Sequence, residues 1–395
     1  MPTKVVVFGS GDCGQLGLGE DITELERPMV VPFFDDKDIT IVSAGGLHNL
    51  ALSSSGTLYS WGCNDEKALG HDEPEWNIGI IALPLMPSER IIQITCGDSI
   101  SAAVTSQGRV YSWGTFRDSQ GVLGFSPSNT QLQGTPHLLD TNNMKVVDIS
   151  AGANHLVAIA GEARDTLISW GSGEQGQLGR RVLARHKING LRPVNITPKK
   201  GILSQYGLAS GSYSRIACGS YHSLAITSSL ILAWGLNNYG QLGNGDSSGS
   251  QMLPYPTAIP NGTSIVDVSA GEHHSLALLS DGRLFAWGRG DSGQLGISKD
   301  FTSPSYSPMQ VAPTSFEAPV QMIASGSNHN LAVDTNQNIY SWGFGAMGQL
   351  GAGSDEDRHV PERLMLPKSL ASLAGLKVRQ IQAGGQHSLL LVEHH

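Results

Sequence analysis

The sequence predicts an all-β fold in which residues 1–395 form a single seven-bladed β-propeller, closed by pairing of the N- and C-terminal strands. Three recurring elements predict this fold: a Gly-x-x-His element, a Trp-Gly pair and an x-Leu-Gly turn. A repeat of about 50 residues is typical of propellers, because a few short strands cannot bury their apolar face until neighbouring copies pack against them.

Each Gly-x-x-His element marks the entry to a strand. Small or apolar side chains alternate with polar ones after the histidine, as in residues 48–53, and this period of two indicates a β strand. A seventh element, Gly97–Ile100, keeps the glycine but has isoleucine in place of histidine. The six complete elements are Gly45–His48, Gly152–His155, Gly219–His222, Gly271–His274, Gly326–His329 and Gly384–His387.

The Trp-Gly pair ends a following strand in six repeats, and the x-Leu-Gly turn comes after it. Stretches such as Gly9–Gly14 match a dinucleotide-binding fingerprint, but they recur at the blade period and no amphipathic helix follows them, so we interpret them as turns. No nucleophile-elbow, Walker or zinc-protease motif appears. We therefore expect no bond-making enzyme and no cofactor.

The two ends of the chain complement each other. The last repeat, which ends in residues 386–392, has no Trp-Gly strand after it, whereas the chain begins with such a strand at Val5–Gly9, followed by the turn Gln15–Gly17. Together the two fragments make one blade. We expect them to pair, because this removes the strand edges that an open array would expose.

Composition narrows the class of protein. Glycine makes up 49 of 395 residues and charged residues only 15%, which suits an all-β protein rich in tight turns. No membrane span or signal peptide is expected, and four scattered cysteines favour an intracellular compartment. The net charge of −9 argues against DNA wrapping as the main activity, because phosphate binding needs a basic footprint.

The repeat histidines have two interpretations. They could be metal ligands or general bases, or they could be buried imidazoles that hydrogen-bond a strand end. One histidine per blade cannot converge on a single ion, so we expect the second interpretation and no metal site. The four cysteines occupy repeat positions that indicate packing.

Two departures from the repeat point to function, since insertions in repeat proteins map to loops. The Trp-Gly aromatic residue and the next turn leucine are eight positions apart in six repeats, as in Trp61–Leu69, but Trp113 and Leu123 are ten apart. The second departure is a long repeat between His155 and His222 that is rich in arginine and lysine. Such a segment could attract an acidic protein surface or nucleic acid, or could be a solvated loop with no partner.

Segments that include these departures resemble the regulators of chromosome condensation, the chromatin-bound exchange factors of the GTPase Ran. The resemblance runs nearly from end to end. The segments that carry it are Gly11–Glu20, Gly62–Glu66, Trp113–Asp118, Gly173–Arg180 and Gly384–His387.

The resemblance implies that one face of the propeller binds Ran and that the lengthened turn acts as a wedge against its nucleotide site. It places on that face Asp12, His48, Asp98, Asn154, Arg180, His273 and His387. The wedge would consist of Phe116, Arg117, Asp118, Ser119, Gln120, Gly121, Val122 and Leu123. No bond is broken in exchange, so no catalytic acid or base is implied.

Two positions depart from the family pattern. Asn154 stands where the family has aspartate, and Pro127 replaces an acidic residue just beyond the wedge. Asparagine keeps the shape and one acceptor but loses the charge, which would weaken a charge-assisted bond by about 1–2 kcal/mol. We therefore expect slower exchange than in the family.

The same resemblance implies a monomeric, nuclear and chromatin-associated protein that does not bind membranes. Contact with nucleosomes or histones would rest on the 181–200 loop, through Arg181, Arg185, Lys187 and Arg192. Three alternatives remain at this point: a propeller that scaffolds chromatin, ubiquitin or trafficking partners, an exchange factor for another small GTPase, and an ultraviolet-B photoreceptor. The last would need clustered tryptophans, whereas six of the seven occupy the repeat's Trp-Gly position.

Overall fold

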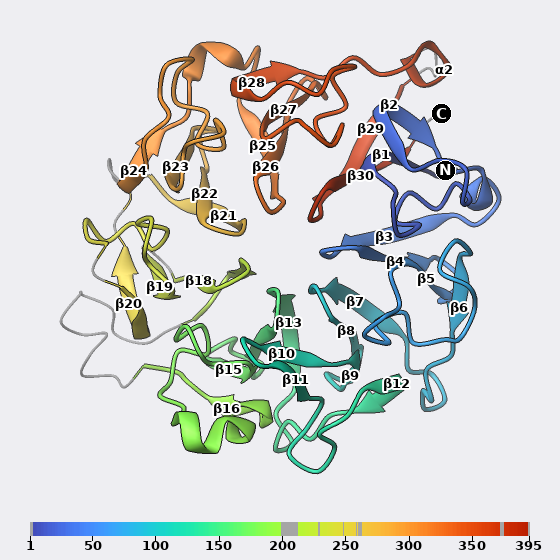
Figure 1. Cartoon of the computed structure of the whole chain (residues 1–395), viewed down its shortest axis with the longest axis vertical. Coiled ribbons are helices and arrows are strands. Elements are labelled where there is room, and N and C mark those ends of the chain that lie inside the picture. The colour runs from blue at the N-terminus through green and yellow to red at the C-terminus, as the bar shows by residue number, and fades with distance from the viewer. Residues whose placement is uncertain are drawn as a thin grey trace.

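The computed structural model describes residues 3–198, 212–227, 230–247, 249–257, 259, 263–371 and 375–393. Over these residues the chain forms seven four-stranded antiparallel sheets that follow one another around a central axis, as Figure 1 shows. The predicted seven-bladed β-propeller is confirmed.

Each of the first four blades runs outward from the strand nearest the axis. Blade 1 contains β3 (Ile39–Ala44), β4 (His48–Ser53), β5 (Leu58–Gly62) and β6 (Gly79–Ile81). Blade 2 contains β7 (Ile91–Cys96), β8 (Ile100–Thr105), β9 (Val110–Gly114) and β12 (Gln133–Leu138). Blade 3 contains β13 (Val146–Ala151), β14 (His155–Ala160), β15 (Thr166–Gly171) and β16 (Val194–Asn195). Blade 4 contains β17 (Arg215–Cys218), β18 (His222–Ile226), β19 (Ile231–Gly235) and β20 (Gln251–Thr257).

The remaining blades have the same order. Blade 5 contains β21 (Ile265–Ala270), β22 (His274–Leu279), β23 (Leu284–Gly288) and β24 (Ser305–Gln310). Blade 6 contains β25 (Val320–Ser325), β26 (His329–Asp334), β27 (Ile339–Gly343) and β28 (Arg358–Arg363). Blade 7 contains β29 (Lys377–Ala383), β30 (His387–Glu393), β1 (Thr3–Ser10) and β2 (Glu24–Val30). The described helical segments are η1 (Pro32–Phe34), η2 (Ala184–Leu191), η3 (Pro313–Ser315) and α2 (Lys368–Ala371).

Blade 7 joins the two ends of the chain. Strand β1 pairs with β30 from Thr3 opposite Glu393 to Gly9 opposite His387. The innermost strands β29 and β3 then contact each other and complete the ring. The predicted closure by the terminal strands is confirmed.

Two of the repeat glycines are required by close backbone approaches. Gly62, after Trp61, has φ +106°, and a Cβ there would lie 2.4 Å from the Leu47 carbonyl oxygen. Gly45 begins a Gly-x-x-His element, and a Cβ there would lie 2.2 Å from the carbonyl oxygen of Gly97 in the next blade. Both glycines are therefore fixed by sterics, which explains why the two elements recur with glycine at the same place.

The repeat histidines link each blade to the next. The Nε2 atom of His274 lies 2.7 Å from Oδ1 of Asn330, whose Nδ2 donates to the carbonyl oxygen of Gln294. The indole N–H of Trp342 donates to that same carbonyl. Because the Asn330 oxygen can only accept, His274 donates through Nε2. Equivalent contacts join His48 to Ser101, His155 to Ser223, His222 to Ser275, His329 to Ser388 and His387 to Asn49. The predicted buried, hydrogen-bonded histidine is correct, but its partner is a side chain of the next blade rather than a strand end.

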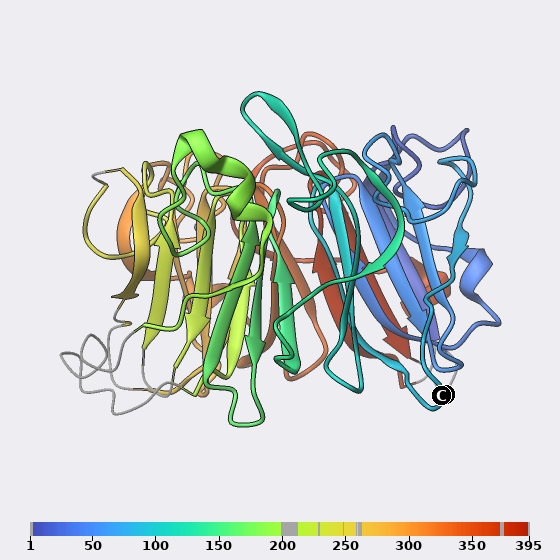
Figure 2. The ribbon, with the colours of Figure 1, turned by 90° about the horizontal axis from the view of Figure 1, so that it is seen from below.

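An additional two-stranded hairpin emerges from blade 2. It consists of β10 (Phe116–Asp118) and β11 (Gly121–Gly124) and covers the lengthened turn that the sequence singles out. Figure 2 shows this hairpin, in teal, projecting beyond the ring on the same face as η2. Among the described residues, no helix has the length and apolar character that a bilayer span requires.

Candidate protein-binding face

The face that carries the hairpin is hollowed at the mouth of the central channel. The depression has a volume of about 620 Å³. Its lining comes from turns of several blades, so side chains far apart in the sequence face one space. They include Glu66, Asp98, Arg117, Asn154, Glu272 and Asn328. Three predicted site residues, Asp98, Arg117 and Asn154, are thus brought together.

Two carboxylates make the channel mouth acidic. Asp98 is accessible to solvent, but the surrounding turns restrict its hydration; this restriction and, to a smaller extent, the nearby charge of Glu272 raise the pKa of its carboxyl to about 6. Glu272 accepts a hydrogen bond of 3.2 Å from the Asn328 side chain. The mouth therefore suits a cationic or hydrogen-bond-donating group of a partner.

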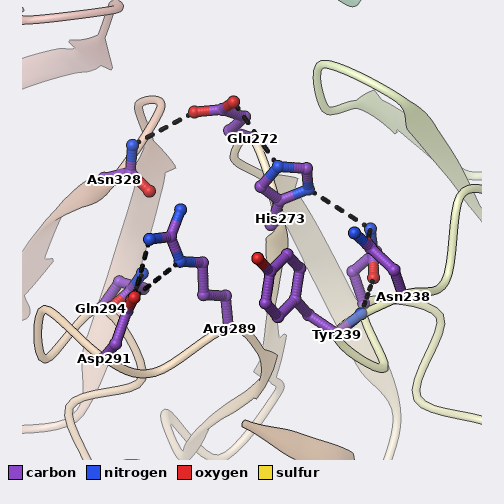
Figure 3. Close-up of polar contacts among 9 residues, drawn as sticks. Asn238, Tyr239, Glu272, His273, Arg289, Asp291, Gln294 and Asn328 are labelled. Carbon is purple, nitrogen blue, oxygen red and sulfur yellow. Dashed lines mark hydrogen bonds and ion pairs between the residues drawn. The ribbon is translucent and has the colours of Figure 1, made fainter. Parts of the chain in front are cut away.

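His273 lies in an aromatic and polar cluster between blades 4 and 5, drawn in Figure 3. Its ring stacks on Tyr221 with centroids 5.7 Å apart and tilts against Tyr239 at 5.0 Å. Its Nε2 lies 3.5 Å from a Glu272 oxygen. Burial lowers the pKa of His273, and Arg289 lowers it further, while Glu272 opposes the shift. We therefore expect a neutral imidazole at pH 7, held in place by its aromatic neighbours.

The base of the β10–β11 hairpin is apolar. Phe116 and Leu123 are buried in a cluster with Ile100, Leu156 and Trp170 at the boundary between blades 2 and 3. Asp118 pairs with Gly121 across the hairpin, and Oδ1 of Asp118 accepts the Gln120 backbone N–H at 2.8 Å, closing a two-residue turn. The hairpin is therefore anchored in the core and ends in an exposed polar tip.

Polar contacts from both neighbouring blades hold the hairpin. On the blade 1 side, Arg117 pairs with Glu66. On the blade 3 side, Asn154 Oδ1 accepts the Arg117 backbone N–H at 2.8 Å. Glu174 accepts both the backbone N–H and the hydroxyl of Ser119, at 2.8 and 2.9 Å.

The predicted basic loop also contacts the hairpin. Lys187 Nζ, on η2, lies 2.5 Å from Oδ2 of Asp118. Arg181, Arg185 and Arg192 are exposed, and none of them forms an ion pair within the described residues. Lys199 and Lys200, which the sequence also places in this loop, lie outside the described residues. The four candidate cations thus separate into three exposed arginines and one lysine bound to the hairpin.

Several predicted contact residues lie away from the depression. His48 and His387 are 1% and 0% exposed and bond the next blade, so their side chains do not reach a partner. Arg180 turns back on its own loop and donates to the carbonyl oxygens of Gly190 and Arg192 at 3.0 and 3.1 Å. Asp12 is exposed on the loop after β1. The prediction that His48 and His387 contact a partner directly does not fit this geometry, because β4 and β30 are buried along their whole length.

Four further residues of the site could not be identified from the sequence repeats. Glu66, Glu174, Glu272 and Asn328 receive no predicted role from the sequence, although the first two lie in turns that follow Trp-Gly pairs on either side of blade 2. A charge in the turns that flank the one lengthened turn is the signal that points to Glu66 and Glu174, and the repeat pattern holds no such signal for Glu272 and Asn328.

A group of metal-type ligands lies on the same face. Cys63, Asp65 and Glu75 each place one ligand atom within 4.8 Å of the others. Glu75 accepts the Asn64 backbone N–H at 3.2 Å, and burial raises the pKa of the Cys63 thiol to about 11. These contacts hold the turn after β5, and Asp65 remains exposed.

Comparison with known proteins identifies the family of this chain. The chain matches the model of the RCC1-like domain over residues 4–390. The regulator of chromosome condensation of Xenopus laevis is 34% identical over 98% of this chain and 89% of that protein. The guanine nucleotide exchange factor SRM1 of Saccharomyces cerevisiae is 32% identical over 92% of this chain and 82% of that protein.

A solved structure is similar over the whole ring. The crystal structure of Prp20p from Saccharomyces cerevisiae, described with its binding properties to Gsp1p and histones, aligns with a TM-score of 0.89 and 31% identity. The alignment covers 100% of this chain and 92% of that one. This chain therefore belongs to the family of the regulators of chromosome condensation.

Proposed function

We propose that this protein is a guanine-nucleotide exchange factor for the GTPase Ran, and that the β10–β11 hairpin is the element that displaces the nucleotide. The observation that carries the proposal is the position of the hairpin: it projects from the face whose depression is lined by Asp98, Asn154 and its own Arg117. The exchange activity named for the SRM1 relative and the Gsp1p binding described for Prp20p support the same function.

The mechanism is differential binding rather than bond chemistry. A small GTPase holds its nucleotide through phosphate-loop amides, a lysine and Mg²⁺. A partner that binds the nucleotide-free GTPase more tightly must weaken nucleotide binding by the same factor, because the two equilibria are linked. A rigid hairpin inserted beside the phosphate and metal site provides that difference, while the surrounding face holds the emptied GTPase.

The test is release of fluorescent GDP from Ran at catalytic amounts of this protein. The comparison variant replaces residues 118–121 with Gly-Gly, which shortens the hairpin by two residues and keeps the buried Phe116 and Leu123. We expect this variant to fold and Ran to release GDP at least about tenfold more slowly in its presence than with the intact protein. Equal release rates with and without the hairpin tip would contradict the mechanism. Stoichiometric Ran binding without faster release would favour the scaffold alternative.

We further propose that the exposed arginines of the basic loop bind an acidic histone surface, which would make the protein nuclear and chromatin-associated. The histone binding described for Prp20p supports this. Neutralising Arg181, Arg185 and Arg192 should weaken nucleosome pull-down and reduce its salt dependence, because exposed cations act mainly by long-range attraction. Unchanged capture would exclude the loop as the contact.

We also propose that the protein acts as a monomer without a membrane partner, because the ring uses its own two ends to close its strand edges. Sedimentation equilibrium across a range of concentrations should give the mass of one chain, and a concentration-dependent increase would contradict this.

A further inference from the structure

Six of the seven blade junctions share one polar arrangement. In each, a repeat histidine bonds a serine or asparagine of the next blade, and that residue donates to the carbonyl oxygen that precedes the turn leucine. At five of them the tryptophan of the next blade donates to the same carbonyl, as Trp113 does to Ala68. The arrangement fixes the turn of one blade to the second and third strands of the next.

The junction between blades 2 and 3 lacks this arrangement. Ile100 replaces the histidine and Leu156 replaces the serine or asparagine. The turn itself is replaced by the β10–β11 hairpin, and the Trp170 indole N–H has no acceptor among the described residues. Phe116 and Leu123 instead fill the junction with apolar contacts. The hairpin is thus not fixed by the interaction that fixes the other six turns.

A different set of contacts fixes its tip. Both carboxylate oxygens of Asp118 are used: Oδ1 accepts the Gln120 N–H that closes the turn, and Oδ2 binds Lys187. The Asp118 side chain is 1% exposed, so its charge depends on Lys187, which is itself 42% exposed, rather than on direct hydration. Glu174 holds the next residue, Ser119, through two hydrogen bonds.

We propose that Lys187 is a positioning residue for nucleotide exchange: through Asp118 it holds the hairpin tip in the orientation that reaches the GTPase, with Glu174 as its partner in this role. This inference rests on the proposed exchange function for its consequence, but the positioning itself is a property of the free protein. It assigns to the basic loop an intramolecular role beside its proposed histone contact.

The experiment compares K187M with K145M. Lys145 pairs with Glu162 on the same blade, and both side chains are exposed, so K145M makes the same substitution and removes a surface ion pair away from the hairpin. The first measurement is amide hydrogen exchange of residues 117–122 in the free protein. We expect K187M to accelerate it at least about tenfold, because a local opening becomes easier once the Asp118 charge is unpaired. K145M should leave it unchanged.

The second measurement is Ran exchange under multiple turnover. Misplacement of the hairpin should lower kcat about tenfold with little change in KM, since the rest of the face proposed to bind Ran is intact. K187R keeps a cation opposite Asp118 and leaves the bond from the Gln120 N–H to Asp118 intact, so it should retain most of the protection and exchange rate that K187M loses. Unaltered hydrogen exchange in K187M would overturn the proposal. Wild-type protein that leaves GDP release unaccelerated would instead overturn the exchange function, while the protection of residues 117–122 would still decide the positioning role.

Discussion

At the scale of the residue, each buried histidine depends on its partner in the next blade. H274L alone leaves the Asn330 oxygen buried without a donor, which should cost about 1–3 kcal/mol of unfolding free energy. H274L/N330L should recover most of that loss, because it reproduces the apolar pair Ile100 and Leu156 that this protein already tolerates. Urea unfolding of the wild type, both single variants and the double variant measures the coupling. A double variant no more stable than the sum of the single changes would contradict it.

The same histidines make stability depend on pH. Burial lowers the pKa of the six repeat histidines from 6.5: to about 4 for His48 and His274, to about 3 for His155, His329 and His387, and well below 6.5 for His222. Between these values and 6.5 the unfolded chain binds more protons than the folded one, so stability falls as pH decreases through this window. Each histidine contributes a slope of about 1.4 kcal/mol per pH unit.

Two carboxyls act in the opposite direction. Restricted hydration raises the pKa of Asp98 and Asp267 to about 6, with a smaller effect of Glu272 on Asp98, so the folded chain binds their protons first. The histidines outnumber them, and we expect maximal stability above pH 6.5 with loss of the fold on acidification. Denaturation midpoints from pH 8 to 5 measure this, and H274L/N330L should show a shallower dependence by one proton. If stability instead rose towards pH 5, the histidines at the blade junctions would not be neutral in the folded protein.

At the scale of the element, the hairpin joins an apolar base to a polar tip, and Asn154 lies between the two. N154A removes the acceptor of the Arg117 N–H and should slow Ran exchange. N154D keeps the acceptor and adds the charge of the family residue, so it should strengthen a bond to the GTPase by about 1–2 kcal/mol and accelerate release. Nucleotide-release rates of the two variants test this. Equal rates for N154D and the wild type would show that the charge has no role here.

Sequence alone predicted where the hairpin lies in the chain but not the contacts that hold it. The ten-residue spacing from Trp113 to Leu123 identified the segment, because every other turn has the same length. The contact between Lys187 and Asp118 joins residues 69 apart in the sequence, and no periodic pattern predicts which cation of a basic segment turns inward. Similarly, the element Gly45–His48 predicted the start of a strand. It did not predict that His48 would bond Ser101, because that partner lies in the next blade and depends on how the blades pack.

At the scale of the whole molecule, the ring is closed by a few residues at one end of the chain. Deleting residues 1–10 removes β1 and exposes the edge of β30, where Leu389–Leu391 are buried in the intact protein. We expect this variant to aggregate, since an unpaired apolar edge is a template for intermolecular pairing. Light scattering after size exclusion would detect the assemblies.

A circular permutant provides the matched control. Thr3 lies opposite Glu393, so a short linker can join these two residues, with new ends at the exposed turn Ser54–Gly56. This variant keeps every strand paired and should elute as a folded single chain. If the deletion variant were equally soluble, closure by β1 would be unnecessary for the fold.

The pairing of Thr3 with Glu393 also decides how the protein can be tethered. Figure 2 shows the C-terminal end on the face opposite the hairpin, and the antiparallel register brings the start of β1 to the same side. A bead, fluorophore or fused domain attached at either end would therefore lie on the face opposite the hairpin. Protein immobilised in this way would leave its hairpin accessible to a GTPase in solution.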